Sequence, residues 1–276
     1  SFGTDLAILC QLEIDRKTVL ISDKSWSASQ EGPLGLNDLM QGECYDARKE
    51  NICEWHPVTE KQFGYENLVC SNSFDVVEKE NYTGKQIHTP NGEVVIDFGQ
   101  NIAGYVKFGF YAQAGQCITL YHGECLDQNG NFTQENFQAP EHRVEQCVKY
   151  ICKEGWNEYK PEKSIFGFRY IKAITDVKVT EKNFTAIAVY SDMPQTGKFE
   201  CGHPGINQLF SNAVWSMKGN FLEIPTDCPT RERTGFTGDA QVFVNTGMYL
   251  MECYPVYRKF LSELREVQLE GGCISQ

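Results

Sequence analysis

The spacing of apolar residues changes once along this chain, near Tyr190, and that change limits what the chain can fold into. Before Tyr190 apolar residues alternate with polar ones, as in 105–110, which is the period of a half-buried strand. After it they recur at helical spacing, and further helical stretches follow at about 239–250 and 254–270. The first helical stripe consists of Ile206, Leu209, Phe210, Ala213, Val214, Met217 and Phe221. The sequence therefore predicts β-structure up to about Tyr190 and helices beyond it.

The β part is expected to form antiparallel sandwiches. Many short strands are separated by Gly, Asn and Asp turns, and Asn91-Gly92 is a strong hairpin signal. A polar stretch at 78–84 marks a division. The expected fold class is therefore multidomain β + α. The expected units are the end of a first sandwich at 1–78, a second sandwich at 79–190, and the start of a helical domain at 191–276.

Charge and cysteine usage exclude several classes of function. The chain has 37 acidic and 25 basic residues, a net charge of −12, so it repels phosphate backbones and anionic lipid. We therefore expect no nucleic-acid partner and no membrane partner, whereas neutral substrates remain open. Twelve cysteines are scattered without CxxC spacing, which argues against a zinc knuckle. Reduced thiols in a reducing compartment such as the cytoplasm are favoured, with disulfides and the oligomeric state left open.

The segment 223–238, between the first two helical stretches, has neither a helix nor a strand period. It contains two prolines and two glycines, and an irregular connection longer than about 12 residues is usually functional. Asp227, Glu232 and, just beyond it, Asp239 accompany two arginines. Hydrolysis of a glycosidic bond needs a carboxylic acid for the leaving oxygen and a carboxylate for the water, and sugar recognition needs further carboxylates. We therefore take this segment, called the site loop below, as the candidate active site.

Each of these residues also has a purely structural interpretation. Asp239 can cap the helix that follows it, and Asp227 can form a turn with its own backbone. Glu232 can be a solvated charge paired with a neighbouring arginine. Phe236 can belong to the core, and Cys228 can be an inert buried thiol. Spacing alone leaves both interpretations open.

A resemblance to a known family favours the functional interpretation. PTDCPTRERTGFTGDAQVF, at 225–243, resembles the signature of the bacterial α-L-rhamnosidases. Three further stretches are similar to segments of that family in the same order: QGECYDARKE at 41–50, VVIDFGQNIAGYVKF at 94–108 and KSIFGFRYIKA at 163–173. The chain departs from the pattern in two ways. Phe236 stands where the family usually has Trp, and the spacing before Glu232 is one residue shorter than in the RDER variant.

The resemblance implies a fold and a mechanism. The helices would be the first of an (α/α)6 barrel, and the activity would be inverting hydrolysis that releases terminal α-L-rhamnose from a glycan or glycoside. By position, Glu232 would be the general acid, Asp227 and Asp239 would hold rhamnose hydroxyls, and Arg231 and Phe236 would contact the sugar. No metal and no cofactor is implied, because a carboxylate pair suffices for this hydrolysis.

Two further expectations follow from that mechanism. A general acid has to hold its proton, so Arg231 and Arg233 are expected to turn away from Glu232, towards other carboxylates or backbone carbonyls. The family's general base lies later in the barrel, so the chain is expected to be a piece of a longer enzyme, cut at both ends and inactive by itself.

Two other functions stay open at this point. One is a carbohydrate-binding module without catalysis, formed by the sandwiches. The other is an (α/α)6 glycosidase with a different sugar specificity.

Overall fold

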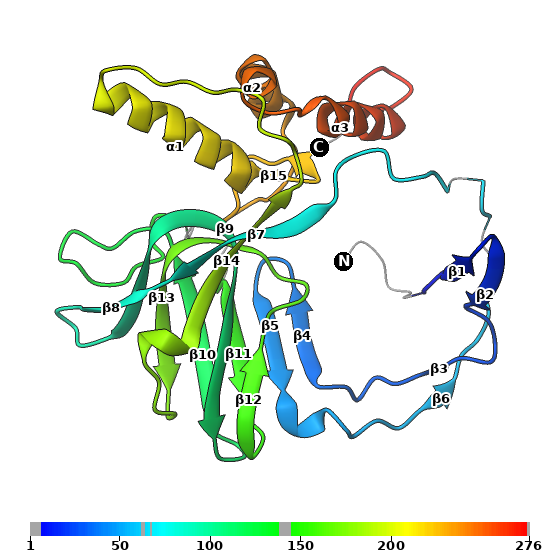
Figure 1. Ribbon diagram of the computed structural model, residues 1–276. Coiled ribbons are helices and arrows are strands. Elements are labelled where there is room, and N and C mark those ends of the chain that lie inside the picture. The colour runs from blue at the N-terminus through cyan, green and yellow to red at the C-terminus, as the bar shows by residue number, and fades with distance from the viewer. Residues whose placement is uncertain (1–6, 62–63, 67, 138–144, 275–276) are drawn as a thin grey trace.

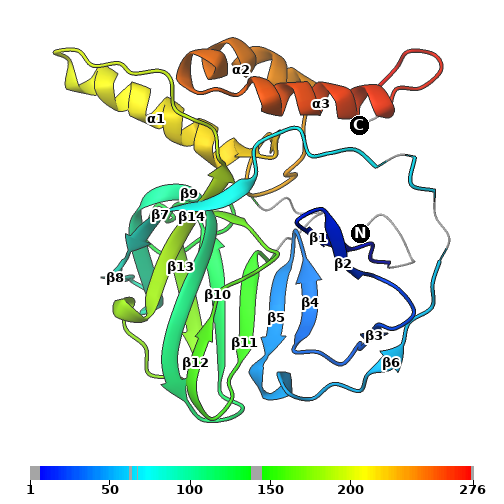
Figure 2. The same ribbon diagram turned by 45° about the vertical axis from the view of Figure 1, so that its right-hand side comes forward.

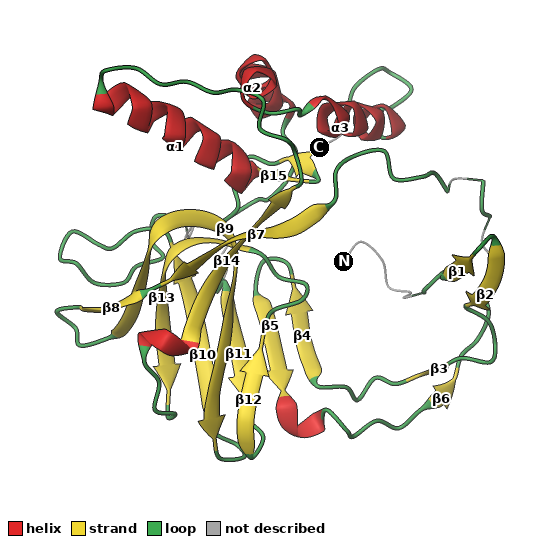
Figure 3. Cartoon of the chain, viewed as in Figure 1, coloured by secondary structure: helices red, strands yellow, loops and turns green. Residues whose placement is uncertain are grey.

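The computed structural model describes residues 7–61, 64–66, 68–137 and 145–274. Strands occupy the chain up to Ser191 and helices dominate after it (Figures 1 and 3), so the predicted change of structure near Tyr190 is confirmed. One short hairpin, β15 (Phe221–Leu222) with β16 (Ile224–Pro225), corrects the expectation of helices only beyond that point. Among the helices described, none is both long and apolar enough to cross a membrane.

One curled sheet forms the body of the β part. Its strand order is β4-β5-β11-β10-β13-β9-β14-β7, and β8 and β12 also pair with β9. These strands, called the β-domain below, are β4 (Leu34–Asp38), β5 (Gly42–Asp46), β7 (Val76–Thr83), β8 (Lys85–His88), β9 (Val94–Ala112), β10 (Cys117–Gly123), β11 (Cys147–Ile151), β12 (Gly155–Tyr159), β13 (Phe166–Thr175) and β14 (Phe184–Ser191). The long strand β9 curls the sheet, because its first part pairs with β8 and β13 and its last part with β14 and β12.

The strands β4 and β5 join this sheet although they precede the expected division at residue 78. β5 runs parallel to β11, from Gly42 opposite Cys147 to Asp46 opposite Ile151, so the sheet is not antiparallel throughout. The other early strands form two small pairs away from the large sheet (Figures 1 and 2): β1 (Gln11–Ile14) with β2 (Lys17–Ile21), and β3 (Ser27–Ala28) with β6 (His56–Pro57). The division into units at 78 and 190 remains a proposal.

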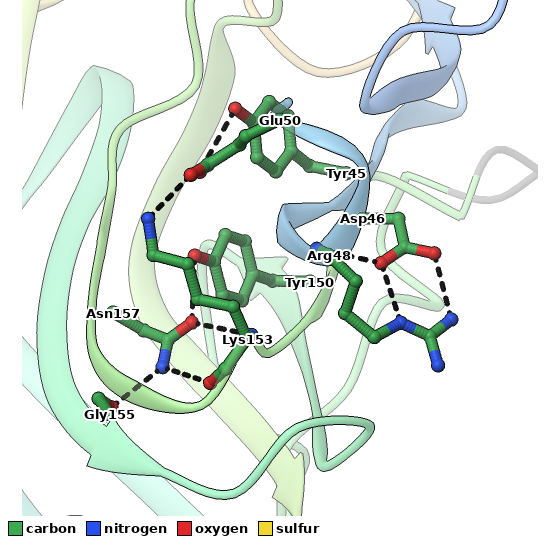
Figure 4. A network of polar contacts seen from close by, with 8 residues as sticks. All are labelled: Tyr45, Asp46, Arg48, Glu50, Tyr150, Lys153, Gly155 and Asn157. Carbon is green, nitrogen blue, oxygen red and sulfur yellow. Dashed lines mark hydrogen bonds and ion pairs between the residues drawn. The ribbon is translucent and has the colours of Figure 1, made fainter. Parts of the chain in front are cut away.

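Polar contacts attach the segment after β5 to the turn between β11 and β12 (Figure 4). Lys153 Nζ lies 2.5 Å from a Glu50 carboxylate oxygen, just after the short helix η1 (Ala47–Lys49). The amide of Asn157 donates to the carbonyls of Lys153 and Gly155, and its oxygen accepts from the hydroxyl of Tyr150. Glu50 therefore ties the segment after β5 to the large sheet through Lys153.

The β-domain has its own core because alternate side chains of each strand point inwards. Phe108 and Phe110 of β9 lie stacked with ring centroids 5.5 Å apart, and Tyr150 meets Phe108 edge to face. The hairpin signal at Asn91-Gly92 is confirmed. β8 and β9 pair across a turn in which Gly92 adopts a φ of 69°, which suits glycine.

Three helices lie over one end of the β-domain (Figures 1 and 2): α1 (Pro204–Asn220), α2 (Thr237–Leu250) and α3 (Tyr254–Glu266). α3 ends four residues before the expected end at 270. A second core holds the helices together; its buried members include Met217, Phe221, Leu250, Val256, Tyr257 and Phe260. The predicted β + α fold class is confirmed.

Candidate active site

The site loop lies against strand β13 of the β-domain. Gly167 faces it, and a Cβ at that position would lie 2.6 Å from Thr230 Cγ2 and 2.7 Å from Pro229 Cγ. The side-chain amide of Gln146, just before β11, donates to the carbonyl of Thr230. The loop therefore depends on the β-domain for its position, and glycine at 167 allows the close approach.

The loop is closed on itself around Asp227. The N–H of Asp227 donates to the carbonyl of Thr234 at 3.1 Å, and the N–H of Thr234 donates back to Asp227 Oδ1 at 3.1 Å. Partial burial alone would raise the pKa of Asp227. Hydrogen bonds from Cys228 and the Thr234 N–H, with a further hydrogen bond shared with the Glu232 carboxyl, outweigh burial and hold that pKa below its usual value. Asp227 is therefore ionised at neutral pH and presents an acceptor.

Glu232 is exposed, and its carboxylate has two further neighbours in the loop besides Asp227. The Cys228 thiol donates to Glu232 Oε2 at 3.4 Å, and Arg231 Nε lies 3.3 Å from the same oxygen. The expectation that both arginines turn away is therefore wrong for Arg231. Its side chain is about half exposed, so the pair forms in solvent with little desolvation to oppose it.

Arg233 does turn away from Glu232, as expected. It adopts a left-handed backbone with φ of 53°, and its Nη1 donates to the carbonyl of Leu39 in the turn between β4 and β5. Its guanidinium also lies over the ring of Phe166, 5.7 Å from the centroid. Burial lowers the pKa of Arg233 to about 10, so it remains charged at neutral pH.

Asp239 lies in the first turn of α2 but does not cap it. The N-cap residue is Phe236, which is half-buried, and no side chain makes a capping hydrogen bond there. The charge of Asp239 suits the positive end of the helix dipole, and its side chain has no hydrogen-bond or ion-pair partner among the described residues. The capping interpretation is therefore ruled out.

Asp227 and Asp239 share one pocket of about 210 Å³ between the three helices. Arg231, Glu232 and Phe236 lie on the same loop but do not line it. Helical residues that sequence reasoning missed complete its wall, and two of them are Asn220 of α1 and Tyr257 of α3. Asn220 Oδ1 and the Tyr257 hydroxyl are buried without a partner in the described part of the chain. Their helical spacing signals core packing only, so nothing in the sequence could have found them.

This arrangement suits acid catalysis on a polyol. An exposed carboxyl can give a proton to a leaving oxygen, and two carboxylates in a pocket can accept hydrogen bonds from sugar hydroxyls. Asp227, Cys228 and Glu232 also bring one ligand atom each within 4.8 Å of one another. We assign no metal to them, because hydrolysis by a carboxyl pair requires none.

Comparison with known proteins finds matches to one family along the whole chain. Three family models match in order: the alpha-L-rhamnosidase N-terminal domain at 1–85, the bacterial alpha-L-rhamnosidase concanavalin-like domain at 87–190, and its 6-hairpin glycosidase domain at 194–276. Curated alpha-L-rhamnosidases of Formosa agariphila and Streptomyces avermitilis are each 32% identical, over 97% and 99% of this chain. The chain spans only 30% and 28% of their lengths.

Solved structures agree. The Streptomyces avermitilis alpha-L-rhamnosidase complexed with L-rhamnose superposes with a TM-score of 0.87 at 31% identity, over 97% of this chain and 27% of that one. The native enzyme from Aspergillus terreus gives a TM-score of 0.84 at 32% identity, over 92% of this chain and 31% of that one. With three successive family domains matched across nearly all its residues, the chain belongs to the bacterial α-L-rhamnosidase family.

Proposed function

We propose that the protein is an inverting glycoside hydrolase that releases terminal α-L-rhamnose from a glycan or glycoside. The observation that carries the proposal is a loop that exposes Glu232 while two other carboxylates, Asp227 and Asp239, share a pocket. The relative solved with L-rhamnose supports rhamnose as the sugar, since it is 31% identical over 97% of this chain.

In this proposal Glu232 is the general acid. As the bond between the anomeric carbon and the glycosidic oxygen breaks, its carboxyl proton moves to that oxygen. A water attacks the anomeric carbon from the opposite face and gives its proton to a second carboxylate. The Cys228 thiol donates to Glu232 Oε2 at 3.4 Å, which leaves the other carboxyl oxygen, Oε1, to carry the proton.

Asp227 and Asp239 would bind the sugar through its hydroxyls. Asp227 is held ionised by hydrogen bonds within the loop, so it acts only as an acceptor. Asp239 brings a second acceptor from the first turn of α2. Arg231 and Phe236 lie on the same loop outside the pocket, where they would contact the sugar or its leaving group.

The test is hydrolysis by the protein at its full encoded length. Aryl α-L-rhamnoside should be cleaved, and aryl glycosides of other sugars should be cleaved at least about 10²-fold more slowly, since a site built for particular hydroxyls rejects sugars that leave them unpaired. Preference for another sugar would overturn the rhamnose assignment. Binding of rhamnosides without turnover would instead make the protein a carbohydrate-binding module.

A further inference from the structure

We infer that Arg233 is a positioning residue, which fixes the site loop on the β-domain and thereby sets where the carboxyl of Glu232 lies. The inference rests on the proposed function, because it concerns the placement of the proposed acid. Arg233 itself touches neither the pocket nor the Glu232 carboxylate.

The first support is the position of the Arg233 side chain. It leaves the loop and enters the β-domain, where Nη1 donates to the carbonyl of Leu39, 194 residues earlier in the chain. The guanidinium also lies 5.7 Å from the ring centroid of Phe166, at the start of β13. One side chain therefore connects the loop to two separate parts of the β-domain.

The second support is the backbone at the same residue. Arg233 has a φ of 53°, a left-handed conformation that is strained for a non-glycine residue. Such a conformation persists only where surrounding contacts impose it. Glu232 precedes it directly, and the two Cα atoms lie about 3.8 Å apart across the peptide bond. A shift of Arg233 is therefore passed on to Glu232.

The third support is the set of groups that directly contact the guanidinium. The charge of Asp38 acts on Arg233 from a distance, but no carboxylate lies within ion-pair distance of Arg233 among the described residues. Burial lowers the pKa of His122 to about 3, so its ring is neutral, and Nδ1–H donates to the carbonyl of Gln146 at 3.0 Å. His122 stacks on Phe166, at 4.0 Å between ring centroids. The arginine is thus held by a carbonyl and an aromatic face.

The same junction contains unmatched donors and acceptors. Nε and Nη2 of Arg233 are buried donors without partners in the described part of the chain, while Nε2 of His122 and Oε1 of Gln146 are buried acceptors without partners there. Each such group destabilises the fold while it is unpaired. Hydrogen bonds from the guanidinium to these acceptors would remove that cost. Because the acceptors are neutral, they would hold the loop without adding an anion beside the acid.

Catalysis is sensitive to such positioning. A displacement of about 1 Å in a catalytic group can lower the rate about 10²-fold. A misplaced acid matters most when the leaving group needs a proton, and least when it departs readily as an anion. The ratio of activities on a poor and an activated leaving group therefore separates acid positioning from general loss of stability.

The experiment uses the protein at its full encoded length with three variants: Arg233→Met, Arg233→Lys and Gly167→Ala. The third places a Cβ against Pro229 and Thr230, and so moves the same loop from the other side. The matched control is Arg48→Met, which removes a guanidinium bound to Asp46 beside η1, at the end of the β-domain away from the helices (Figure 3). For each, kcat/KM is measured on an alkyl rhamnoside and on an activated aryl rhamnoside, together with the melting temperature.

Arg233→Met and Gly167→Ala should lower kcat/KM on the alkyl rhamnoside by about 10–100-fold and much less on the aryl rhamnoside. Arg233→Lys should recover part of the loss, since one ammonium can still reach the Leu39 carbonyl. Arg48→Met should keep the wild-type ratio.

If Arg233→Met and Gly167→Ala fold and keep the wild-type ratio of activities on the two substrates, this inference is overturned while the proposed function stands. Failure of all three variants to fold would also overturn it, because the role of Arg233 would then be stability only. Absence of wild-type hydrolysis of rhamnosides would overturn the proposed function, and this inference with it.

Discussion

The carboxylate of Asp97 binds the guanidinium of Arg169 through two hydrogen bonds of 2.8 Å, one from Nε and one from Nη2. Asp97 lies on β9, and Arg169 lies on β13 at a shift in register, where the four β9 residues 98–101 stand against this one residue of β13. A bulge of this kind redirects one side chain. The pair joins two segments that resemble the family, 94–108 and 163–173, and lies two residues from Gly167, which supports the site loop.

This ion pair predicts that the free energy of unfolding decreases at acid pH. Burial alone would raise the pKa of Asp97, but hydrogen bonds from Arg169 and the Gly99 N–H, with the charge of Arg169, lower it below its usual value. The stabilisation is therefore complete above the unfolded pKa of about 3.9, and is lost as the pH falls through the lower folded pKa. Asp97→Asn should lower the free energy of unfolding by about 1 kcal/mol at pH 7 and by less at pH 3.

Urea unfolding at the two pH values measures this difference. Asp15→Asn is the control, because it changes an exposed aspartate in the turn between β1 and β2. An equal loss at pH 7 and pH 3 in Asp97→Asn would show that packing, and not the charge, makes Asp97 important.

The general-acid role of Glu232 predicts a dependence on the leaving group. Glu232→Gln removes the transferable proton and nearly preserves shape, so turnover of an alkyl rhamnoside should fall by about 10²–10⁴-fold. An activated aryl rhamnoside should lose much less, because its phenolate departs with little protonation. Steady-state kinetics on the two substrates gives both values.

The control for that variant is Glu223→Gln, which alters another exposed glutamate of the site loop, 3.4 Å from Lys259. It should behave as wild type on both substrates. Equal and small losses in Glu232→Gln, with unchanged binding, would move the acid role to Asp227 or Asp239.

Sequence spacing predicted the elements better than their partners. The period change near Tyr190 located the strands and helices, because burial of a strand or helix face is a local property of spacing. The parallel pairing of β5 with β11 has no such local signal, since about 100 residues separate the pair Gly42 and Cys147. The division expected at residue 78 stays a prediction.

The candidate site shows the same limit. The irregular loop and its carboxylates identified Asp227 and Asp239, which do share a pocket. The contact of Arg231 with Glu232 departs from the expectation, because solvent screens the exposed pair and the need for a protonated acid does not decide where Arg231 lies. The role of Arg233 depends on the Leu39 carbonyl, and no motif within the loop encodes that partner.

Asp239 gives a prediction that separates binding from stability. Asp239→Asn keeps the shape but weakens hydrogen bonds to sugar hydroxyls, so kcat/KM on an aryl rhamnoside should fall about 10–100-fold, since a hydrogen bond to a charged group contributes about 1.5–3 kcal/mol. The melting temperature should change little, because Asp239 makes no capping hydrogen bond in α2. A lower melting temperature with unchanged kinetics would instead give Asp239 a purely structural role.

The distance between Asp227 and Glu232 decides whether Asp227 can be the base of an inverting pair. One oxygen of each carboxylate lies within 4.8 Å of the other, whereas an inverting pair needs roughly 6.5–9.5 Å to admit a water. Asp227 also accepts from the Thr234 N–H at 3.1 Å, which ties it to closure of the loop and suits a fixed acceptor for a hydroxyl. Asp227 is therefore not the base of an inverting pair.

The proposed mechanism predicts that hydrolysis inverts the anomeric carbon, with the base contributed by another residue. Proton NMR during the first minutes of cleavage should show β-L-rhamnose from an α-L-rhamnoside, before mutarotation mixes the anomers, and Asp227→Asn should slow the reaction without changing the anomer. Early α-L-rhamnose would contradict this, because retention requires a nucleophile at roughly 5–5.5 Å from the acid, and Asp227 would then be that nucleophile.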